Sequence, residues 1–338
     1  MADKPPTIID VAREAGVSKS SASRALLGHS DVSQETLARV LAAADRLGYV
    51  PNEMARGLVS RRTKMLGALL RDTSIAFYGL LQVAMQRRAR ELGYGLVSMT
   101  GAGELTENDA GKMLRTLISL QVDGLLVSAA QLRGEDLVGY ADRVPIVVVG
   151  RAESTEGIVS VFCDEVDGGT RMGEYVVRLG HRSVAVLQVP QTASASQFAR
   201  TQSMIDTLKA SGVTVSVIPL SSHLGPVGSA VAAALSNPTI TALMCPSDVL
   251  MVQVLEELRV RAIPVPGQLS VTGYDGFGVL ADPLFAFTTF QQPVEQIAAL
   301  AVDRVVEWIE QGRPDQMRMP VQGQLVPGRT TAPPRPMV

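Results

Sequence analysis

The sequence predicts an all-α helix-turn-helix head and a hinge helix, followed by an α/β core of two Rossmann-like subdomains. Three observations support this fold class. Three short amphipathic windows, each ended by a glycine, fill the first fifty of the 338 residues. A proline then precedes one further short helical window. From residue 64 onward, short apolar runs alternate with amphipathic windows, which is typical of parallel sheets covered on both faces by helices.

The predicted head consists of three helices. Each begins after a hydroxyl side chain, which caps the unpaired N–H groups of a helix start, and each ends at or near a glycine. Two helices joined by a glycine-containing turn match the helix-turn-helix plan. The predicted caps and stops are Thr7 and Gly16 for the first helix, Ser18 and Gly28 for the second, and Ser33 and Gly48 for the third.

The second of these helices has an unusual composition. Residues 16–28 read GVSKSSASRALLG, with four serines between positions 18 and 23. Serine is a mediocre helix former because its hydroxyl competes for backbone hydrogen bonds. A property other than helix propensity therefore accounts for a short helix that carries hydroxyls, one lysine and one arginine.

The charge is distributed unevenly along the chain. Residues 1–64 contain ten Lys and Arg against seven Asp and Glu, a balance of +3, whereas the remainder contains 21 against 26, a balance of −5. Between residues 46 and 64, five basic residues face one acidic residue. Such an asymmetry indicates a polyanion-binding end, although an ordinary solvated surface would produce it as well.

The predicted hinge helix follows the head. Pro51 breaks the chain, and Asn52 can cap a helix that continues to about Ser60. A helix of this length is not stable alone in water. It therefore needs a partner that completes it.

The core pattern extends over residues 64–323, which is long for a single sheet. Two sheets with a cleft between them fit this length better, and ligands of such folds bind where strand C-termini meet loops. The predicted strands lie within residues 65–70, 94–99, 122–129, 144–150, 183–189, 213–220, 240–246 and 269–275. The predicted helices lie within residues 80–92, 109–120, 168–179, 200–211, 229–235 and 249–259.

The sequence contains no recognisable catalytic signature. No G-x-G-x-x-G follows a strand, and neither a P-loop nor a G-x-S-x-G elbow is present. We therefore expect no catalytic residues, no cofactor and no enzyme activity.

The residue types that bind metals are also scattered. The three histidines are isolated, and the two cysteines, Cys163 and Cys245, lie far apart in apolar surroundings, which favours buried thiols over a disulfide or zinc site. Asp164 and Asp167 could hold a metal, but a loop that caps the following helix is the simpler interpretation. We expect no metal.

No segment of the sequence suggests a membrane. The chain has no apolar run approaching the ~18 residues that span a bilayer, and its first ten residues lack the apolar region of a signal peptide. Together with the low cysteine content, this predicts a cytoplasmic protein with no membrane partner.

The N-terminal block contains a set of residues at a characteristic spacing over about fifty positions. These residues are Thr7, Asp10-Val11-Ala12, Ala15-Gly16-Val17-Ser18, Ser23-Arg24, Val32-Ser33, Glu35-Thr36, Leu47-Gly48-Tyr49, Pro51-Asn52 and Ala55-Arg56. In this pattern the block resembles the DNA-binding head of the lactose/galactose-repressor (LacI/GalR) family. The resemblance continues through the core, in segments that include VDGLLV, DGGTRMGEYVVRLGHRSVAVL and PLFAFTTFQQP.

This resemblance implies a homodimeric transcriptional repressor with a core like that of periplasmic sugar-binding proteins. Operator DNA and a small polar effector, a sugar or a related metabolite, are the expected partners. Three chain crossings would join the two core subdomains. The implied domains are a head at 1–50, a hinge at 51–63, an N-subdomain at 64–163 plus 293–323 and a C-subdomain at 164–292. The proline-rich end of the sequence predicts a flexible tail at 324–338.

The resemblance also assigns DNA contacts. Lysine and arginine suit guanine acceptors in the major groove, whereas serine is permissive, and hydroxyls fix register on phosphates. An apolar wedge from the hinge would kink the duplex at the operator centre. The implied base-reading residues are Lys19, Ser20 and Arg24; the backbone contacts are Thr7, Ser18, Ser21, Ser23 and Ser33; the hinge residues in the minor groove are Asn52, Ala55, Arg56 and the wedge Leu58.

The effector site is implied in the same way. Arginine with aspartate can grip vicinal hydroxyls, and aromatic rings can stack on an apolar sugar face. A structural ion pair is the alternative role for the arginine and its aspartate. The implied effector-binding residues are Asp72, Phe77, Tyr78, Arg151, Asp164, Arg200, Asp248 and Asp275.

The chain departs from the family pattern at several positions. Ile75-Ala76 replaces the usual Asn-Pro, Gly150 stands where an aspartate commonly precedes Arg151, and Gln188-Val189-Pro190 replaces Gly-Gly-Pro. Ser247 replaces the usual asparagine before Asp248, and Leu27 replaces the asparagine that usually follows the recognition helix.

Three other functions are compatible with parts of the sequence. A transporter's solute-binding protein would share the core but would not need the head. An enzyme would require a catalytic signature. A regulator of the same family with a cleft that binds no effector, or one controlled by a protein partner, is the nearest alternative.

Overall fold

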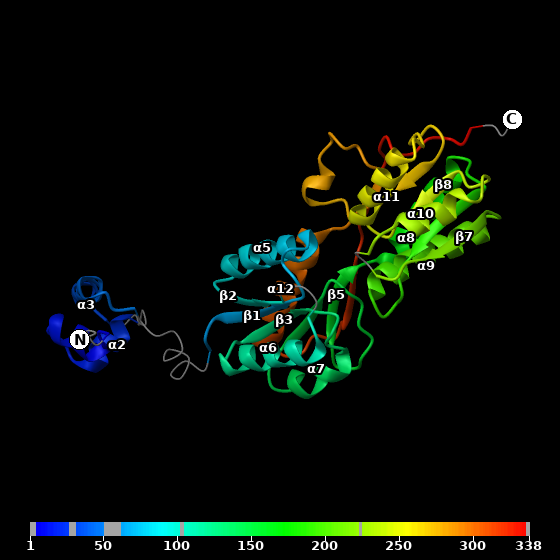
Figure 1. Ribbon diagram of the computed structural model, residues 1–338. Coiled ribbons are helices and arrows are strands. Elements are labelled where there is room, and N and C mark those ends of the chain that lie inside the picture. The colour runs from blue at the N-terminus through cyan, green and yellow to red at the C-terminus, as the bar shows by residue number, and fades with distance from the viewer. Residues whose placement is uncertain (1–4, 27–31, 51–61, 102–104, 223–224, 336–338) are drawn as a thin grey trace. The chain divides into compact units, whose positions relative to one another are not determined.

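The computed structural model describes residues 5–26, 32–50, 62–101, 105–222 and 225–335 (Figure 1). The chain divides into two compact units, Met1–Lys64 and Met65–Val338. The first unit contains only helices among its described residues, and the second combines helices with parallel sheets.

The N-terminal unit packs α1 (Ile8–Glu14), α2 (Lys19–Leu26) and α3 (Gln34–Leu47) around a core of small side chains. Six of its eight buried apolar residues are alanines, which lets the three helices approach closely. Gly16, with a φ of 64°, makes the turn between α1 and α2, a conformation that glycine adopts without strain. The buried residues are Val11, Ala12, Ala15, Ala22, Ala25, Val40, Ala43 and Ala44.

The predicted helix starts of this unit are confirmed. The Ser18 and Ser33 hydroxyls accept hydrogen bonds from the backbone N–H groups of Ser21 (3.0 Å) and Thr36 (3.2 Å). The Thr7 N–H and hydroxyl both donate to the Asp10 carboxylate, over 2.9 and 2.6 Å. Gly48 ends α3 in the left-handed conformation, as predicted.

The larger unit contains a six-stranded parallel sheet in the order β11-β5-β4-β3-β1-β2. Helices α5 and α12 cover one face, and α6 and α7 lie on the other (Figure 1). The elements are β1 (Met65–Leu70), α5 (Ala76–Glu91), β2 (Gly95–Thr100), α6 (Glu107–Ser119), β3 (Gly124–Ser128), α7 (Gly134–Ala141), β4 (Ile146–Val149), β5 (Val159–Cys163), α12 (Val294–Gln311) and β11 (Arg318–Val321).

A second parallel sheet has four strands in the order β7-β6-β8-β9, and a two-stranded antiparallel sheet pairs β10 with β12. The chain passes between the large sheets three times, from β5 to α8, from β10 to α12 and from β11 to β12. The elements are α8 (Glu165–Arg178), β6 (Ser183–Gln188), α9 (Ala195–Ala210), β7 (Thr214–Pro219), α10 (Gly228–Leu235), β8 (Ala242–Met244), α11 (Asp248–Val260), β9 (Ser270–Thr272), a short 3₁₀ helix (Gly278–Ala281), β10 (Thr289–Gln291) and β12 (Gln324–Val326).

The predicted fold class is confirmed. Each of the eight predicted strand windows contains a strand, and each of the six helical windows coincides with a helix. The apolar runs are continuous because strands such as β3 and β5 are buried along their whole length. Strands β5, β10, β11 and β12 and helices α7 and α12 were not among the predicted windows.

The C-terminal tail differs from its prediction. Residues 324–338 were expected to be flexible, but β12 pairs with β10, and Thr330 is buried. The Val271 N–H donates to the Thr330 carbonyl (2.8 Å), and the Ser270 hydroxyl donates to the Ala332 carbonyl (3.0 Å). The proline-rich sequence misled the prediction because the tail borders β9 through backbone hydrogen bonds that sequence composition does not reveal.

None of the helices within the described part of the chain is both long and apolar enough to cross a membrane.

Candidate functional site: a helix surface and a cleft within the core

Helix α2 has two distinct faces. Ala22 and Ala25 are buried against α1 and α3, whereas Lys19, Ser20 and Arg24 are exposed. At 3.6 residues per turn, the three exposed positions lie on the side of the helix opposite the alanines. This exposed surface presents two cations and a hydroxyl, which can donate hydrogen bonds to phosphate oxygens or to acceptors on base edges.

Four of the five remaining hydroxyls predicted to contact DNA, those of Thr7, Ser18, Ser21 and Ser33, have structural partners. The hydroxyls of Ser18 and Ser21 lie 2.9 Å apart and both belong to the start of α2. Thr7 and Ser33 begin α1 and α3. These side chains fix the helix starts, whereas the Ser23 hydroxyl, which is half-buried, belongs to the middle of α2.

The predicted hinge residues Asn52, Ala55, Arg56 and Leu58 lie outside the described residues, as does Leu27. Their predicted roles stay predictions.

The second candidate site is a cleft formed by residues that precede or follow strands of both large sheets. It comprises two adjoining cavities of about 110 and 60 Å³ that share six lining residues. Of the predicted effector contacts, Phe77, Tyr78, Arg151, Arg200 and Asp275 lie in this lining. Other lining residues that the sequence did not single out for this role include Arg71, Gly150, Ser194, Ser196, Gln197 and Gln292.

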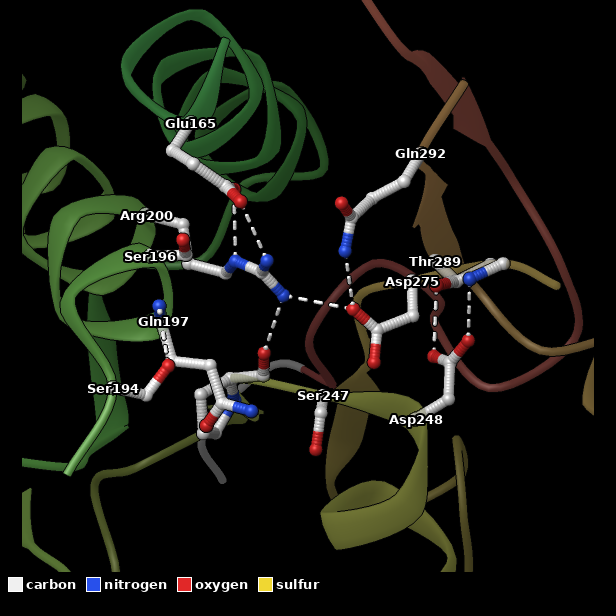
Figure 2. Close-up of polar contacts among 12 residues, drawn as sticks. Glu165, Ser194, Ser196, Gln197, Arg200, Ser247, Asp248, Asp275, Thr289 and Gln292 are labelled. Atoms are coloured by element: carbon white, nitrogen blue, oxygen red, sulfur yellow. Dashed lines mark hydrogen bonds and ion pairs between the residues drawn. The ribbon is translucent and has the colours of Figure 1, made fainter. Parts of the chain in front are cut away.

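Arg200, on α9, is the centre of a buried ionic network (Figure 2). Its Nε and Nη2 donate to the two carboxylate oxygens of Glu165 over 2.8 and 2.6 Å. Its Nη1 donates to Asp275 Oδ1 (2.9 Å) and to the Pro246 carbonyl (3.1 Å). Four of the five N–H groups of a guanidinium are thereby used, and the group also lies 3.9 Å above the Tyr274 ring.

Burial and charge act in opposite directions on this network. Arg200 is only 3% exposed. Burial by itself lowers its pKa, but the adjacent Glu165 and Asp275 carboxylates reverse the effect and hold the pKa above its ordinary value. Burial also raises the pKa values of both carboxyl groups, while Arg200 opposes that rise. The arginine therefore stays charged, and its main partner, Glu165, lies 35 residues away in the sequence.

Asp275 occupies a specific backbone position at the cleft. It follows β9 with a φ of 121°, which is unfavourable for a residue with a Cβ atom and is held by surrounding contacts. The Gln292 side-chain amide donates to the same Asp275 Oδ1 atom over 2.7 Å (Figure 2). Arg200 and Gln292 thus fix the carboxylate that faces the cleft.

Asp248 lies beneath this loop and not in the cleft lining. Its carboxylate accepts hydrogen bonds from the Gly276 N–H and the Thr289 hydroxyl, both over 2.7 Å (Figure 2). Burial, reinforced by the nearby Asp275 charge, raises the pKa of Asp248 to about 7. Asp248 was predicted to bind the effector, but its contacts are those of a positioning residue that holds the loop after β9.

Two other predicted aspartates are also absent from this lining. Asp72 accepts a hydrogen bond from the Ser74 N–H (2.9 Å) in the turn before α5. Asp164 caps α8 through the Asp167 N–H (3.1 Å) and lines a different cavity of about 420 Å³. That larger cavity is walled mainly by apolar side chains, so it offers fewer groups that could orient a polar ligand.

Arg151 lies at the edge of the cleft and is held in place. Its guanidinium donates to Glu153 over 2.6 Å and to the Leu132 carbonyl. Burial opposes ionisation of Glu153, but hydrogen bonds from Arg151 and Thr155 outweigh it and lower the pKa of Glu153 to about 2. This arginine is therefore neutralised by a carboxylate that is ionised at neutral pH.

The residue types that bind metals do not gather in the part of the chain described by the structure, where no three His, Cys, Asp or Glu side chains form a cluster suited to a metal ion. Cys163 and Cys245 are both buried and unbonded, as the sequence predicted. Burial raises the pKa of both thiols well above the ordinary value, which makes them unreactive.

Two family models match this chain. Residues 7–52 match the model described as bacterial regulatory proteins, lacI family. Residues 63–325 match periplasmic binding proteins and the sugar binding domain of the LacI family.

Individual relatives match over nearly the whole chain. A sucrose operon repressor from Pediococcus pentosaceus is 29% identical over 90% of this chain and 93% of its own. A lac repressor dimer bound to operator and an anti-inducer has a similar fold, with a TM-score of 0.85 at 23% identity over 97% of this chain and all of the other. A transcriptional regulator CelR–cellobiose complex is 26% identical over 96% of this chain and 99% of that one, with a TM-score of 0.65.

Proposed function

Because the chain belongs to the LacI family of DNA-binding transcriptional regulators, which are not enzymes, we propose that it is a repressor controlled by a small polar effector. It binds a near-palindromic operator as a homodimer. Its place of action is the cytoplasm, where the chromosome lies. The observation that carries the proposal is the exposed surface of α2, with Lys19, Ser20 and Arg24 opposite its buried alanines.

In this proposal, α2 is the recognition helix. Lys19 and Arg24 donate to guanine O6 and N7, and Ser20 accepts or donates according to the base. The short serine side chains allow the helix to approach the groove floor. Thr7, Ser18, Ser21, Ser23 and Ser33 contact phosphates and set the register of the head, which adds affinity but no direct sequence information.

The hinge helix completes the contact in the minor groove. Leu58 of each subunit enters the central base step, and Asn52, Ala55 and Arg56 contact the same groove. Unstacking a step costs a few kcal/mol, which the wider contact with bent DNA offsets. A short helix that is unstable alone suits this role because operator DNA and the partner hinge stabilise it.

Exposed apolar side chains on the core support the homodimer. Leu80 and Val83 on α5 are exposed, as are Val249 and Val252 on α11. Each pair has i,i+3 spacing and therefore lies on one face of its helix. A second copy would cover such faces, and tethering two heads raises the effective concentration of the second head at its half-site.

The cleft is the effector site of this proposal. Phe77 and Tyr78 provide aromatic surface, and Arg200, Asp275 and Gln292 provide fixed polar groups. The cavities are smaller than the roughly 300 Å³ at which ligand pockets usually begin, so a sugar-sized molecule requires the subdomains to separate about the three crossings. The names of two relatives, a sucrose operon repressor and a regulator complexed with cellobiose, support a sugar-like effector.

Effector control then follows from differential affinity. A ligand that binds one arrangement of the two subdomains better than the other shifts their equilibrium by that difference. The shift changes how the paired hinges are held, and the coupling is reciprocal between DNA and effector.

The test of this function is operator binding by the full-length protein. A binding site is selected from random duplex DNA with the wild type, and the affinities of Arg24→Ala and Arg39→Ala are then measured on selected and unselected DNA. Both changes remove one exposed positive charge, but Arg39 lies on α3. We expect Arg24→Ala to lose most of the preference for the selected site and Arg39→Ala to keep it. An unchanged preference in Arg24→Ala would overturn the assignment of α2.

A further inference from the structure

The charged groups of the cleft are almost all paired within the protein. Asp275 is paired with Arg200, which is also paired with Glu165 behind the lining, and Arg151 is paired with Glu153. Paired groups of this kind have little charge left for a ligand. A charged lining residue without such a partner therefore decides which ligand charge the cleft favours.

Arg71 is that residue. It follows β1, is half-buried and lines both adjoining cavities. Within the described ranges, no ion pair includes Arg71, in contrast to Arg151 and Arg200. Burial raises the pKa of Tyr78; the nearby Arg71 opposes that rise, and the Asp72 carboxylate adds to it. Asp72 is therefore also close to this end of the cleft, but Arg71 forms no ion pair with it among the described residues, so this half-buried cation is left to attract an anion from solution.

The groups around Arg71 suit the same anion. Ser194 and Ser196 line both cavities. Ser194 is the N-cap of the 16-residue helix α9 and accepts from the Gln197 N–H (3.3 Å), and Ser196, in the first turn, donates to the Gly150 carbonyl (3.4 Å). The N-terminus of this helix favours negative charge. Gly150, on the opposite wall, has no side chain and so places no carboxylate there. Its hypothetical Cβ atom would lie 2.8 Å from the Phe77 ring, so larger side chains are excluded while Phe77 keeps its place.

The other end of the cleft suits hydroxyl groups. Asp275 and Gln292 lie in the lining with their side chains fixed by a mutual hydrogen bond. The Gln197 side-chain oxygen is buried in the lining and accepts no hydrogen bond from the protein. These are acceptors for ligand hydroxyls.

Building on the proposed function, we propose that the effector is a polyhydroxylated anion, whose carboxylate or phosphate binds Arg71 and whose hydroxyls bind Asp275, Gln292 and Gln197. Sugar acids and sugar phosphates share this chemistry. A neutral sugar would fill the same volume but would leave the Arg71 charge without a counter-ion in a site partly shielded from water. Arg71 is then the residue that determines ligand class.

The experiment measures binding to the full-length protein by calorimetry. The panel contains neutral hexoses, the matching aldonic and uronic acids, hexose phosphates and inorganic phosphate alone. We expect one anionic class to bind at least tenfold more tightly than the neutral sugar of the same skeleton, and inorganic phosphate to bind more weakly than either. Comparing the sugar acids with the hexose phosphates shows whether the anionic group of the ligand is a carboxylate or a phosphate.

Two variants complete the test. Arg71→Gln keeps a polar side chain but removes its charge, and we expect it to lower the affinity for the anion by about 10- to 100-fold. Arg115→Gln, at an exposed position on α6, is the matched control and keeps wild-type affinity.

The outcomes separate this inference from the proposed function. A neutral sugar that binds wild type and Arg71→Gln equally, but binds Asp275→Asn poorly, overturns the anionic class and leaves the effector cleft standing. An anion whose binding changes in neither Arg71→Gln nor Asp275→Asn lies outside the cleft, which overturns both. Equal affinity for inorganic phosphate and the sugar phosphate overturns the part of the inference that concerns the hydroxyls.

Discussion

An alanine at Gly169 should destabilise the protein, whereas an alanine at Gly139 should stabilise it. Both glycines are inside helices, where alanine is intrinsically favoured by about 1 kcal/mol. Their surroundings differ. A Cβ atom at Gly169, on α8, would lie 2.2 Å from the Arg200 carbonyl oxygen, whereas one at Gly139, on α7, would meet no atom within 4 Å.

The magnitude follows from the contact at Gly169. The obstacle is the backbone of α9 and not the end of a flexible side chain, so α8 and α9 must move apart by roughly 1 Å to restore ordinary contact. Overpacking of this kind costs about 1–3 kcal/mol, which exceeds the intrinsic gain. We expect a net loss of about 1–2 kcal/mol for Gly169→Ala and a gain of about 0.5–1 kcal/mol for Gly139→Ala.

The assay is thermal unfolding of both full-length variants by circular dichroism at one protein concentration, since dimerisation makes the midpoint concentration-dependent. At about 2–4 °C per kcal/mol for a large domain, Gly169→Ala should unfold several degrees below wild type and Gly139→Ala slightly above it. The displacement also moves Arg200 relative to Glu165. If Gly169→Ala were as stable as Gly139→Ala, the claim that close contact between α8 and α9 excludes a side chain at residue 169 would be refuted.

Three further predictions concern pH, capping and the tail. The pKa of Asp248 is raised to about 7, so between about pH 4 and 7 the folded state keeps a proton that the unfolded chain has lost. The free energy of unfolding therefore falls as the pH rises through this range, by ~4 kcal/mol at most. Between pH 5 and pH 8, Asp248→Asn should lose less of its free energy of unfolding than wild type. Ser33→Ala removes the cap of α3 and should destabilise the head by about 1 kcal/mol. Ser20→Ala, on the exposed face of α2, should leave its stability unchanged. The helix content of the head, followed during unfolding, measures both effects, and equal destabilisation by the two substitutions would contradict the prediction. Thr330→Val leaves the buried Thr288 N–H without its acceptor and should lower the free energy of unfolding by about 1–3 kcal/mol. Thr116→Val, on the surface, should be nearly neutral. A wild-type unfolding midpoint for Thr330→Val would contradict the packing of the tail against the core.

Local sequence patterns predicted most of the fold. Caps such as Ser18 and Ser33 mark helix starts because their hydroxyls reach N–H groups only three residues away. Apolar runs mark the strands of a parallel sheet because both faces are covered. Local patterns did not predict the structure of the tail, because its hydrogen-bond partners on β9 and β10 are distant in sequence.

The cleft was predictable only in part. The resemblance placed Phe77, Tyr78, Arg151, Arg200 and Asp275 in one site, and the structure brings them to one lining. No feature of the sequence around Arg200 or Glu165 indicated that these two side chains would form an ion pair. Polar residues that follow strand ends, such as Arg71 after β1, were the signal that could have identified further lining residues.

By itself, the sequence determined the helix caps, the alternation of strands and helices, and the family to which the chain belongs, because these depend on residues close together or on intact motif spacing. Only the tertiary structure decided which charges are paired. Arg200 is paired with carboxylates from α8 and from the loop after β9, whereas no ion pair of the described residues includes Arg71. Charge pairing in a cleft depends on distances between segments that the chain brings together only when it folds.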